Sequence, residues 1–245
     1  MPFLTQEQKE VVQNAKSIVA ITGAGISNES GIPTFRGEAG FWKNFRAEDL
    51  ATPQAFQKDP KLVWEWYDWR RLLCSKANPN DGHLTLASWD NHHPRFSLIT
   101  QNVDGLHIRA GSKHILEIHG NIFQFRCTKC SFHGHIDNSR QGDGLKFCPN
   151  CSALVRPNIV WFGESYDPKL FENAFLLAQN ASVVLLVGTS ANVSVPRELA
   201  MTAIQSGAFG IEINPESTSL SEFMDVHIQG KAGDVLPKLY SEIIT

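Results

Sequence analysis

The chain has 245 residues, of which 42% are hydrophobic, so it is long enough for one large core or for one core with a small appended module. Its net charge of -3 favours neither a nucleic-acid nor a membrane surface, and no apolar run approaches the roughly 20 residues that span a bilayer. The start, MPFLTQEQKEVVQNAK, lacks the order of basic and apolar residues found in signal and transit peptides, so we expect a cytoplasmic protein.

Helices and buried strands alternate in the first part of the chain. Residues 5–16 are predicted to form a helix with Thr5 as its N-cap, because Gln8 follows three positions later. SIVAITGAGIS is a β-branched run that ends in glycines, which is typical of a buried strand followed by a tight turn. A glycine-rich, charged loop is expected at 28–46, and helices at 60–75 and 82–90.

The second part of the chain continues this alternation around a segment of different character. RFSLITQNVDGLH and HILEIHGN are predicted to be strands that run into polar loops. Residues 125–154 contain four cysteines and few long apolar side chains, which indicates a small inserted module. RPNIVWFGE, SVVLLVGTSANV, AFGIEINPE and DVHIQG are further predicted strands, and helices are predicted at 171–181, 196–206 and 232–244.

Short apolar strands that alternate with helices favour an α/β fold, with a parallel sheet covered by helices on both faces. We expect one domain, with the cysteine-containing segment inserted in it as a small module.

The segment GAGISNESGIPTFR follows the first predicted strand and starts with G-x-G. Glycines let the backbone approach a ligand closely, and a nearby helix N-terminus offers N–H groups to a pyrophosphate. The usual third glycine is displaced, since Gly31 lies eight residues from Gly23, and by itself the motif is equally well explained as a turn. Three strands that end in TGAGIS, TQNVD and GTS nevertheless suggest a dinucleotide crevice at one sheet edge, with Asn214 as a fourth contributor, although β–α turns use the same residues.

Four of the five cysteines form two C-x-x-C pairs, with 17 residues between the pairs. This spacing suits a tetrahedral zinc site with four thiolate ligands, whereas a disulfide frame is disfavoured without an export signal. Because all four positions are filled by thiolates, the metal is predicted to be structural and to hold together a module with little core. The predicted ligands are Cys127, Cys130, Cys148 and Cys151.

The histidines near this module have different expected roles. His133 and His135 lie between the cysteine pairs and are expected to be exposed to solvent rather than bound to metal. His119 ends a short apolar strand in LEIHGN, so its ring should reach the proposed crevice. A histidine is the usual general base near neutral pH, although a lone histidine is more often a hydrogen-bonded structural residue. Cys74 is expected only to pack.

The motifs occur together in an order that resembles a known family. GAGIS, GIPTFR, TQNVDGLH, the HG before the cysteine pairs, IVWFGE after them and VGTS resemble the sirtuins, which are NAD-dependent protein deacylases. The resemblance runs from about residue 10 to 240. It implies a single catalytic domain over residues 1–245, made of a Rossmann-like large lobe and a smaller zinc-containing lobe, with one structural zinc ion. NAD would be a co-substrate that meets the acyl substrate in the cleft between the lobes. The large lobe would comprise about 1–35, 82–118 and 155–245, and the small lobe a helical insertion at about 36–81 and the zinc module at about 120–154.

The resemblance also implies the binding residues. NAD would contact the glycine loop, the ends of the central strands and the start of the last helix, and His119 would be the general base. The implied NAD-binding residues are Gly23, Ala24, Gly25, Ile26, Thr34, Phe35, Arg36, Gln101, Asn102, Asp104, Gly188, Thr189, Ser190, Asn214 and Ala232.

In the implied reaction, the acyl-lysine carbonyl oxygen attacks C1′ of the nicotinamide ribose and nicotinamide leaves. His119 accepts a proton from the ribose hydroxyls, the 2′-oxygen attacks the former carbonyl carbon, and water completes the release of free lysine and 2′-O-acyl-ADP-ribose. The implied partners are acyl-lysine-bearing proteins or peptides, with no nucleic acid or membrane, and we expect a monomer. An extended edge made by Val160, Trp161, Phe162 and Gly163 is expected to pair with the substrate peptide.

The stretch WYDWRR falls in the implied small-lobe helix beside the acyl channel. Tyr67 and Arg70 are three residues apart and project from one helical face, and their Y-x-x-R pattern resembles class III sirtuins, which favour succinyl-, malonyl- and glutaryl-lysine. An arginine fork pairs bidentately with a carboxylate and a tyrosine hydroxyl adds a donor. The alternative is an aromatic helix stripe with arginines that extend to solvent. Arg71 is expected to be structural, and Ala51 to leave room for a longer acyl group.

Three other functions stay open at this point. They are an NAD-dependent deacetylase without a preference for acidic acyl groups, a mono-ADP-ribosyltransferase, and a non-catalytic module that binds NAD or ADP-ribose. Release of free nicotinamide separates the enzymes from the binding module, and the masses of the products separate deacylation from ADP-ribosyl transfer.

Overall fold

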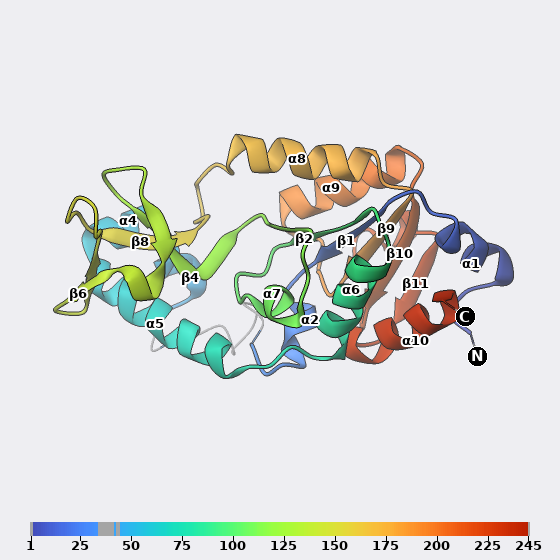
Figure 1. Cartoon of the computed structure of the whole chain (residues 1–245), viewed down its shortest axis with the longest axis horizontal. Coiled ribbons are helices and arrows are strands. Elements are labelled where there is room, and N and C mark those ends of the chain that lie inside the picture. Colours follow the sequence, from blue (N-terminus) through green and yellow to red (C-terminus); the bar gives the residue numbers. More distant parts are fainter. Residues whose placement is uncertain (1, 34–41, 43–44, 245) are drawn as a thin grey trace.

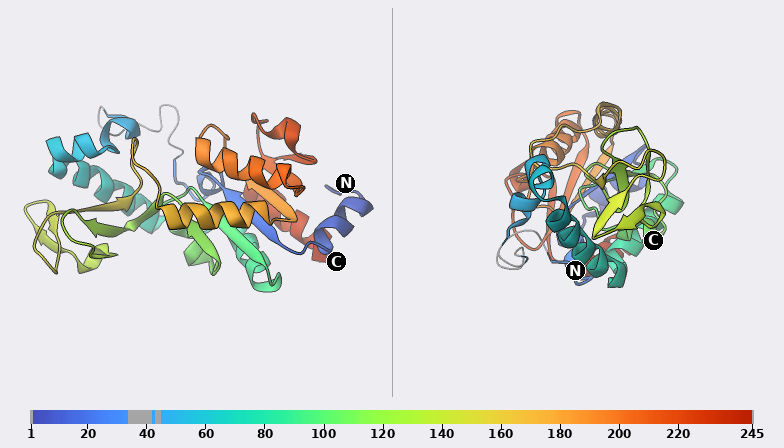
Figure 2. Two further views of the ribbon diagram at one scale, coloured as in Figure 1. Left: turned by 90° about the horizontal axis from the view of Figure 1, so that it is seen from above. Right: turned by 90° about the vertical axis from the view of Figure 1, so that its left-hand side faces the viewer.

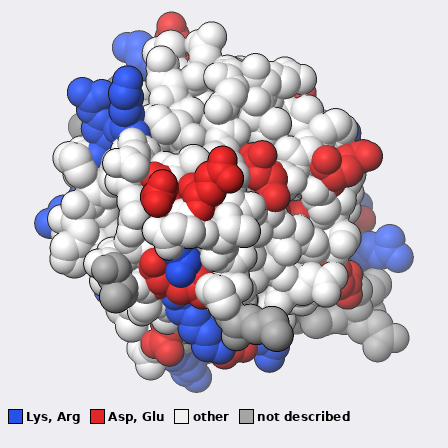
Figure 3. All heavy atoms as spheres, turned by 90° about the vertical axis from the view of Figure 1, so that its right-hand side faces the viewer, with Lys and Arg blue, Asp and Glu red and all other residues white. Residues whose placement is uncertain are grey.

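The structure is a computed structural model that describes residues 2–33, 42 and 45–244. A parallel six-stranded sheet with helices on both faces forms a large lobe, and a smaller lobe extends from one end of it (Figure 1). No helix among the described residues is long and apolar enough to cross a membrane. Both chain termini lie at the far end of the large lobe, where acidic side chains run in a row across the visible face and basic ones lie mostly towards its margin (Figure 3).

The central strands explain why the functional residues gather at one edge. The sheet has the order β11-β10-β9-β1-β2-β3, and every neighbouring pair is parallel. The strands are β1 (Ile18–Thr22), β2 (Phe96–Thr100), β3 (Ile115–Glu117), β9 (Val183–Val187), β10 (Phe209–Asn214) and β11 (Val226–Gln229). The chain builds outward from β1 in one direction and then from β9 in the other, so the order reverses between these two strands, which is where ligands bind in open α/β sheets.

Two helical layers bury the sheet, as the apolar strands predict. Along β1, Ile18 and Ala20 face one core and Val19 and Ile21 face the other. The first core is closed by α1 (Gln6–Gln13), α6 (Asp81–His92) and α10 (Ala232–Ile244), and the second by α8 (Pro168–Gln179) and α9 (Ser194–Gln205), which lie together on one side of the sheet (Figure 2). The predicted capping box of α1 is confirmed, because Thr5 and Gln8 exchange both side-chain-to-backbone hydrogen bonds.

The small lobe has its own sheet and its own aromatic core. In its three-stranded antiparallel sheet, β4 (Gly120–Cys127) lies between β5 (His133–His135) and β8 (Val155–Ile159), and β6 (Arg140–Gly142) pairs with β7 (Leu145–Phe147). Three helices pack against these strands, α3 (Ala47–Leu50), α4 (Pro53–Lys58) and α5 (Pro60–Lys76). Their shared core contains Trp64, Tyr67, Phe125 and Trp161.

The expected lobe boundary at 155 differs from the observed pairing. Residues 155–159 were assigned to the large lobe, but as β8 they pair with β4, and Val155 lies opposite Cys127. A short apolar strand carries no periodicity that distinguishes one buried sheet from another, so its sequence predicts a strand without predicting its partner. The crossing back to the large lobe therefore occurs in residues 160–167, between β8 and α8.

Gly25 is the first residue of α2 (Gly25–Asn28) and packs closely against the turn after β9, so its substitution should destabilise the fold. A Cβ atom at Gly25 would lie 2.6 Å from the carbonyl oxygen and 2.8 Å from the Cα atom of Gly188. We expect Gly25→Ala to lower the free energy of unfolding in urea by about 1–3 kcal/mol, because backbone must move to admit the methyl group. The control is Gly134→Ala, whose Cβ would have 3.7 Å to its nearest neighbours, and equal losses in both variants would contradict the prediction.

Candidate functional site

The turns after β1 and β9 meet at the point where the strand order reverses. Gly23 N donates to Val187 O at 3.0 Å, and Gly25 N donates to Gly188 O at 2.8 Å. Gly188 has a φ of 58°, a left-handed conformation that glycine adopts without strain. A Cβ atom at Gly23 would lie only 2.8 Å from Gly188 O, so the glycines of both turns satisfy a packing requirement between two backbones.

A buried polar network lies beside these turns, at the ends of β1 and β2. The Asn102 side chain donates to Gly23 O at 3.0 Å and to the Ser27 hydroxyl at 3.1 Å. Ser27 in turn donates to the Asp104 carboxylate at 2.8 Å, and burial raises the pKa of Asp104. Sequence reasoning missed Ser27, although it ends the GAGIS motif, because only its contacts with the second strand give it a place in the network.

The third and fourth strand ends join the same edge. Gln101 Nε2 donates to the Thr189 hydroxyl at 3.0 Å, and Asn214 Nδ2 donates to Thr189 O at 3.1 Å. Ile26 and Ala232 are buried in the core beneath, so only their backbones could face a ligand. The structure thus gathers at one edge the predicted residues Gly23, Ala24, Gly25, Gln101, Asn102, Asp104, Gly188, Thr189, Ser190 and Asn214, while Thr34, Phe35 and Arg36 lie outside the described residues.

Two buried histidines contact this network through their rings, and sequence reasoning did not single them out. His83 of α6 and His107 of α7 (Leu106–Ala110) have ring centroids 4.7 Å apart. Their Nε2 atoms contact the hydroxyls of Ser27 at 3.4 Å and Thr22 at 3.0 Å. Burial lowers the pKa of His83 to about 4 and that of His107 well below its usual value, so both rings are neutral at pH 7.

His119 follows β3, the strand next to β2, and its ring has a defined tautomer. Its Nδ1 atom is 3.0 Å from the carbonyl oxygen of Gln101, and its Nε2 atom is 2.9 Å from the hydroxyl of Tyr166. Because a carbonyl cannot donate, Nδ1 carries the proton and Nε2 presents its lone pair. Burial lowers the pKa of His119, against a smaller opposite effect of the bond to Gln101, so the ring is neutral and can accept a proton.

The predicted zinc ligands come together at the tip of the small lobe. The four Sγ atoms lie within 4.8 Å of one another, with Cys127 and Cys151 at 3.5 Å and Cys130 and Cys148 at 3.8 Å. A tetrahedron with Zn–S bonds of about 2.3 Å has S–S edges of about 3.8 Å, so these thiols fit zinc closely. The backbone N–H groups of Lys129 and Cys130 donate to Cys127 Sγ at 3.3 and 3.4 Å, which suits a thiolate ligand.

The residues that sequence reasoning excluded from the zinc site lie apart from it. His133 and His135 are exposed, as predicted, and the metal-ligand cluster found among the described residues contains only the four cysteines. Cys74 is buried in α5, and burial raises the pKa of its thiol to about 11, in keeping with its expected packing role.

Tyr67 and Arg70 lie side by side on α5, as their spacing predicts, with Tyr67 buried and Arg70 partly exposed. Tyr67 is fully buried, and its oxygen accepts a hydrogen bond from Trp161 Nε1 at 2.8 Å. The Arg70 guanidinium lies 4.9 Å from the ring centroid of Trp66 and 5.7 Å from that of Tyr67. Burial raises the pKa of Tyr67 to about 12 and lowers that of Arg70, while Asp104 at the sheet edge acts on Arg70 in the opposite sense.

Arg71 and Ala51, two residues near Tyr67 and Arg70, make contacts of their own. Arg71 pairs with Asp68, which also accepts a hydrogen bond from Lys146 at 2.9 Å, so it takes part in a separate ion-pair network. Ala51 is buried in the same core as Tyr67, and its carbonyl accepts a hydrogen bond from Phe162 N at 3.0 Å.

The expected extended edge at 160–163 is wrong for its second half. Phe162 and Gly163 form a turn, in which Gly163 has a φ of 82°. The N–H of Trp161 already donates to the Glu164 carboxylate at 2.9 Å, and that of Val160 to His119 O at 3.0 Å. These internal bonds tie the segment to His119 and to Arg156, the partner of Glu164, so fewer backbone groups are left for a peptide than a free edge would offer.

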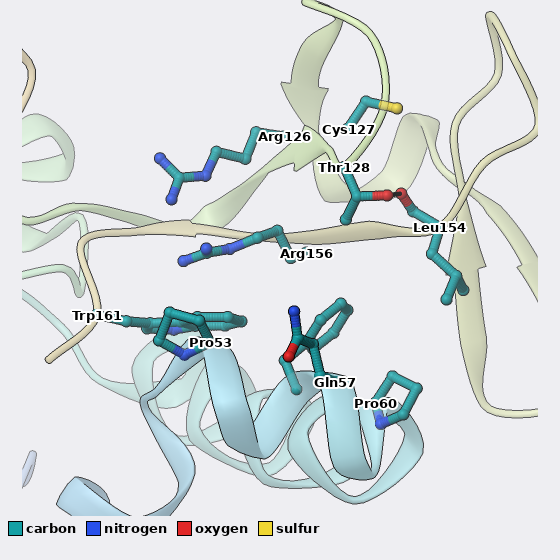
Figure 4. A pocket seen from close by; sticks show the side chains of 10 residues that line it. Pro53, Gln57, Pro60, Arg126, Cys127, Thr128, Leu154, Arg156 and Trp161 are labelled. Atoms are coloured by element: carbon teal, nitrogen blue, oxygen red, sulfur yellow. Dashed lines mark hydrogen bonds between the residues drawn. The ribbon is translucent and has the colours of Figure 1, made fainter. Parts of the chain in front are cut away.

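A pocket of about 480 Å³ lies between α4 and the strands β4 and β8 (Figure 4). The Arg156 guanidinium lies over the ring of Trp161, 3.3 Å from its centroid, and forms one wall. Tyr67 and Arg70 do not line this pocket, so Trp161 contacts Tyr67 at one side and the pocket at the other. The lining residues are Pro53, Phe56, Gln57, Pro60, Arg126, Cys127, Thr128, Leu154, Arg156 and Trp161.

Comparison with known proteins identifies the family. The profile of the Sir2 family matches residues 23–195 of this chain. The chain belongs to the Sir2 family. This sirtuin is 54% identical over 230 residues to an NAD-dependent protein deacylase of Leptospira interrogans, and the match covers 94% of each chain. It is 46% identical to the NAD-dependent protein deacylase of Pyrococcus furiosus, with 97% of each chain covered.

Solved structures of sirtuins have the same fold. A Sir2 homologue in complex with NAD is 40% identical, with a TM-score of 0.93 over 99% of this chain and 95% of the other. A mutant Sir2 homologue in complex with 2′-O-acetyl ADP ribose has a TM-score of 0.92 at 40% identity, with 98% of this chain and 97% of the other covered. A complex of Sir2 with a p53 peptide and NAD+ has a TM-score of 0.85 at 28% identity, with 97% of each chain covered.

The zinc site makes a prediction about metal content. We expect Cys148→Ser to reduce zinc from one ion per chain to a small fraction, and to lower the melting temperature by several degrees or more, because zinc binding contributes directly to the folding of such modules. Zinc is measured by mass spectrometry after gel filtration, and melting by circular dichroism. Cys74→Ala, which removes a buried thiol outside the cluster, should keep one zinc ion. Full zinc content in Cys148→Ser would refute the assigned ligand set.

The buried histidines predict how stability depends on pH. The pKa of these histidines is about 6.5 in the unfolded chain and lower in the folded chain. Below pH 6.5 the unfolded state therefore binds more protons, and the free energy of unfolding decreases as the pH is lowered. Glu117, whose pKa burial raises to about 7, acts in the opposite direction and reduces the net slope. Between pH 6.5 and 4, the free energy of unfolding of His83→Asn should therefore decrease less steeply with falling pH than that of the parent protein. The difference should be up to about 1.4 kcal/mol per pH unit.

The measurement is a series of urea unfolding curves at several pH values. His133→Asn, which changes an exposed histidine, should leave the pH dependence as it is in the parent protein. The same slope in His83→Asn and the parent protein would mean that His83 is protonated in the folded chain.

Proposed function

We propose that this sirtuin removes acyl groups from lysine side chains in an NAD-dependent reaction and prefers acyl groups that end in a carboxylate, such as succinyl and malonyl. The family and the name shared by the curated relatives make the protein an NAD-dependent protein deacylase. The finer preference is carried by one observation, the adjacent pair of buried Tyr67 and partly exposed Arg70. The products are nicotinamide, free lysine and 2′-O-acyl-ADP-ribose, and we expect a monomeric, cytoplasmic enzyme without a nucleic-acid partner.

The general base of the proposed reaction is His119. NAD supplies a ribose carbon that can be attacked and a nicotinamide group that can leave. His119 takes a proton from a ribose hydroxyl at Nε2, since its Nδ1 proton is held by Gln101 O. Burial keeps the ring neutral at pH 7, and the depressed pKa means that the base stays active somewhat below pH 6.5.

The strand-end network is proposed to hold the co-substrate. The dinucleotide lies along the turns of Gly23 and Gly188, where a parallel sheet of this order binds nucleotides. Asn102 and Asp104 are fixed by their bonds to Gly23 and Ser27, so they present a pre-organised polar surface near the nicotinamide end. The zinc ion is proposed to take no part in the reaction, because four thiol ligands leave no coordination position for a substrate.

Tyr67 and Arg70 are proposed to bind the terminal carboxylate of the acyl group. Tyr67 remains a phenol at any physiological pH because its pKa is about 12, and since its oxygen accepts from Trp161, its proton can be donated to the carboxylate. Arg70 adds a charged, bidentate donor in a region of low dielectric, where such a bond is stronger than in water. An acetyl group has no atom that could accept these bonds.

The test is a deacylation assay on one peptide whose single lysine carries an acetyl, malonyl, succinyl or glutaryl group. Release of nicotinamide and the peptide mass are followed together, so that deacylation is separated from ADP-ribosyl transfer. We expect kcat/KM for succinyl to exceed that for acetyl by about 10- to 100-fold, the worth of a charged hydrogen bond. Equal rates on both groups would indicate a general deacetylase, and no nicotinamide release would refute catalysis.

Arg70→Met gives a sharper prediction for the preference. It should reduce kcat/KM for desuccinylation by about 30-fold or more, because the acyl carboxylate then lies buried without its charged partner. Deacetylation should change by less than about 3-fold, since acetyl-lysine does not contact the guanidinium. Arg71→Met, which removes the neighbouring arginine of the Asp68 network, should keep the succinyl-to-acetyl ratio. Equal losses on both substrates in Arg70→Met would give Arg70 a purely structural role.

A further inference from the structure

The hydroxyl of Tyr166 occupies the one acceptor position that the proposed base needs. Tyr166 lies in the crossing segment 160–167, and its oxygen is 2.9 Å from Nε2 of His119. Since Nδ1 donates to Gln101 O, Nε2 has a lone pair and no proton, and the phenol must be the donor. Sequence reasoning missed this contact, because Tyr166 and His119 belong to segments that only the fold brings together.

The phenol is held by packing that does not depend on its hydroxyl group. The Tyr166 ring lies 6.0 Å from the ring of Phe171, which in turn lies 4.7 Å from the ring of Phe175 on α8. Burial and the nearby carboxylate of Glu198 on α9 both raise the pKa of Tyr166, so the hydroxyl remains a donor. The aromatic stack therefore positions the ring, and the O–H group is directed to His119.

We propose that Tyr166 is a positioning residue that holds the Nε2 lone pair of His119 in the crevice and gives it up to the substrate hydroxyl. This proposal rests on the role of His119 as the general base in the proposed function. An imidazole nitrogen accepts one strong hydrogen bond in the plane of its ring, so the phenol and a ribose hydroxyl compete for the same lone pair. The carbonyl of Gln101 fixes the tautomer, the phenol occupies the Nε2 lone pair before the substrate binds, and the substrate must displace the phenol.

The competition has a consequence for the titration of the base. A hydrogen bond donated to Nε2 stabilises the neutral ring, because protonation at Nε2 breaks that bond. No charged side chain is among the causes of the lowered pKa of His119, and Glu117, two positions earlier, is held by Asn121 at 2.7 Å. Removal of the phenol hydroxyl should therefore raise the pKa of His119 by roughly half to one unit, the worth of one hydrogen bond.

The experiment compares the parent protein with Tyr166→Phe, which keeps the aromatic stack and removes the donor. Nitrogen chemical shifts of the imidazole rings give the pKa of His119 directly, with the signal assigned by its loss in His119→Asn. The kinetic measurement is kcat/KM for NAD as a function of pH. We expect the acid limb in Tyr166→Phe to move up by roughly half to one pH unit, and the plateau to rise about 2- to 10-fold because the competitor is gone.

Tyr240→Phe is the matched control, because Tyr240 makes a hydrogen bond of the same length, 2.9 Å, to His92 on the surface of the large lobe. It should change neither the pKa of His119 nor the pH profile. An unchanged pKa of His119 in Tyr166→Phe overturns the proposal. A raised pKa with an unmoved acid limb overturns the hand-over to the substrate and refutes His119 as the base, whereas absence of turnover in the parent protein refutes the proposed function and leaves the NMR result to judge the contact.

Discussion

The contact between two backbones, after β1 and after β9, is the constraint on which the rest of the site depends. Gly25 N bonds to Gly188 O at 2.8 Å, and neither turn has space for a side chain at the contact. Because the turns are locked together, Asn102 reaches Gly23 O from β2, and Asn214 reaches Thr189 O from β10. Four separate strands therefore present their ends as one rigid edge, which a dinucleotide needs if it is to bind without reorganising the protein.

Around this edge, burial disfavours the charged forms of the ionisable groups. His83, His107 and His119 have lowered pKa values, and Asp104 and Glu117 have raised ones, with desolvation as the largest cause in every case. The amide side chains of Gln101 and Asn102 can offer hydrogen bonds to a ligand at this edge without a charge of their own. A neutral His119 also suits the proposed reaction, because an imidazolium could not take a proton.

Local spacing explains which parts of the molecule could be predicted. The capping box of Thr5 and Gln8, the helix around Tyr67 and Arg70 and the four-cysteine cluster all depend on residues close in sequence, or on motifs whose chemistry requires their partners. The partner of β8, the turn at Phe162 and Gly163, and the contact of Tyr166 with His119 were missed. Each is fixed by tertiary packing, to which hydrophobic periodicity is insensitive.

The same tertiary packing joins the residues of the proposed acyl site to the small-lobe core through Trp161. Its indole N–H donates to Tyr67, its ring lies against Arg156 at 3.3 Å, and its backbone N–H donates to Glu164, the partner of Arg156. Tyr67 is thus oriented from behind by a residue that is itself held at three points. A phenol that is already oriented loses little entropy on binding a carboxylate, so the proposed bond to the acyl group would contribute nearly its full strength. Arg70 is ordered in the same way, because the rings of Trp66 and Tyr67 pack beside its guanidinium and partial burial limits the water around it, which would favour the proposed bond to an acidic acyl group.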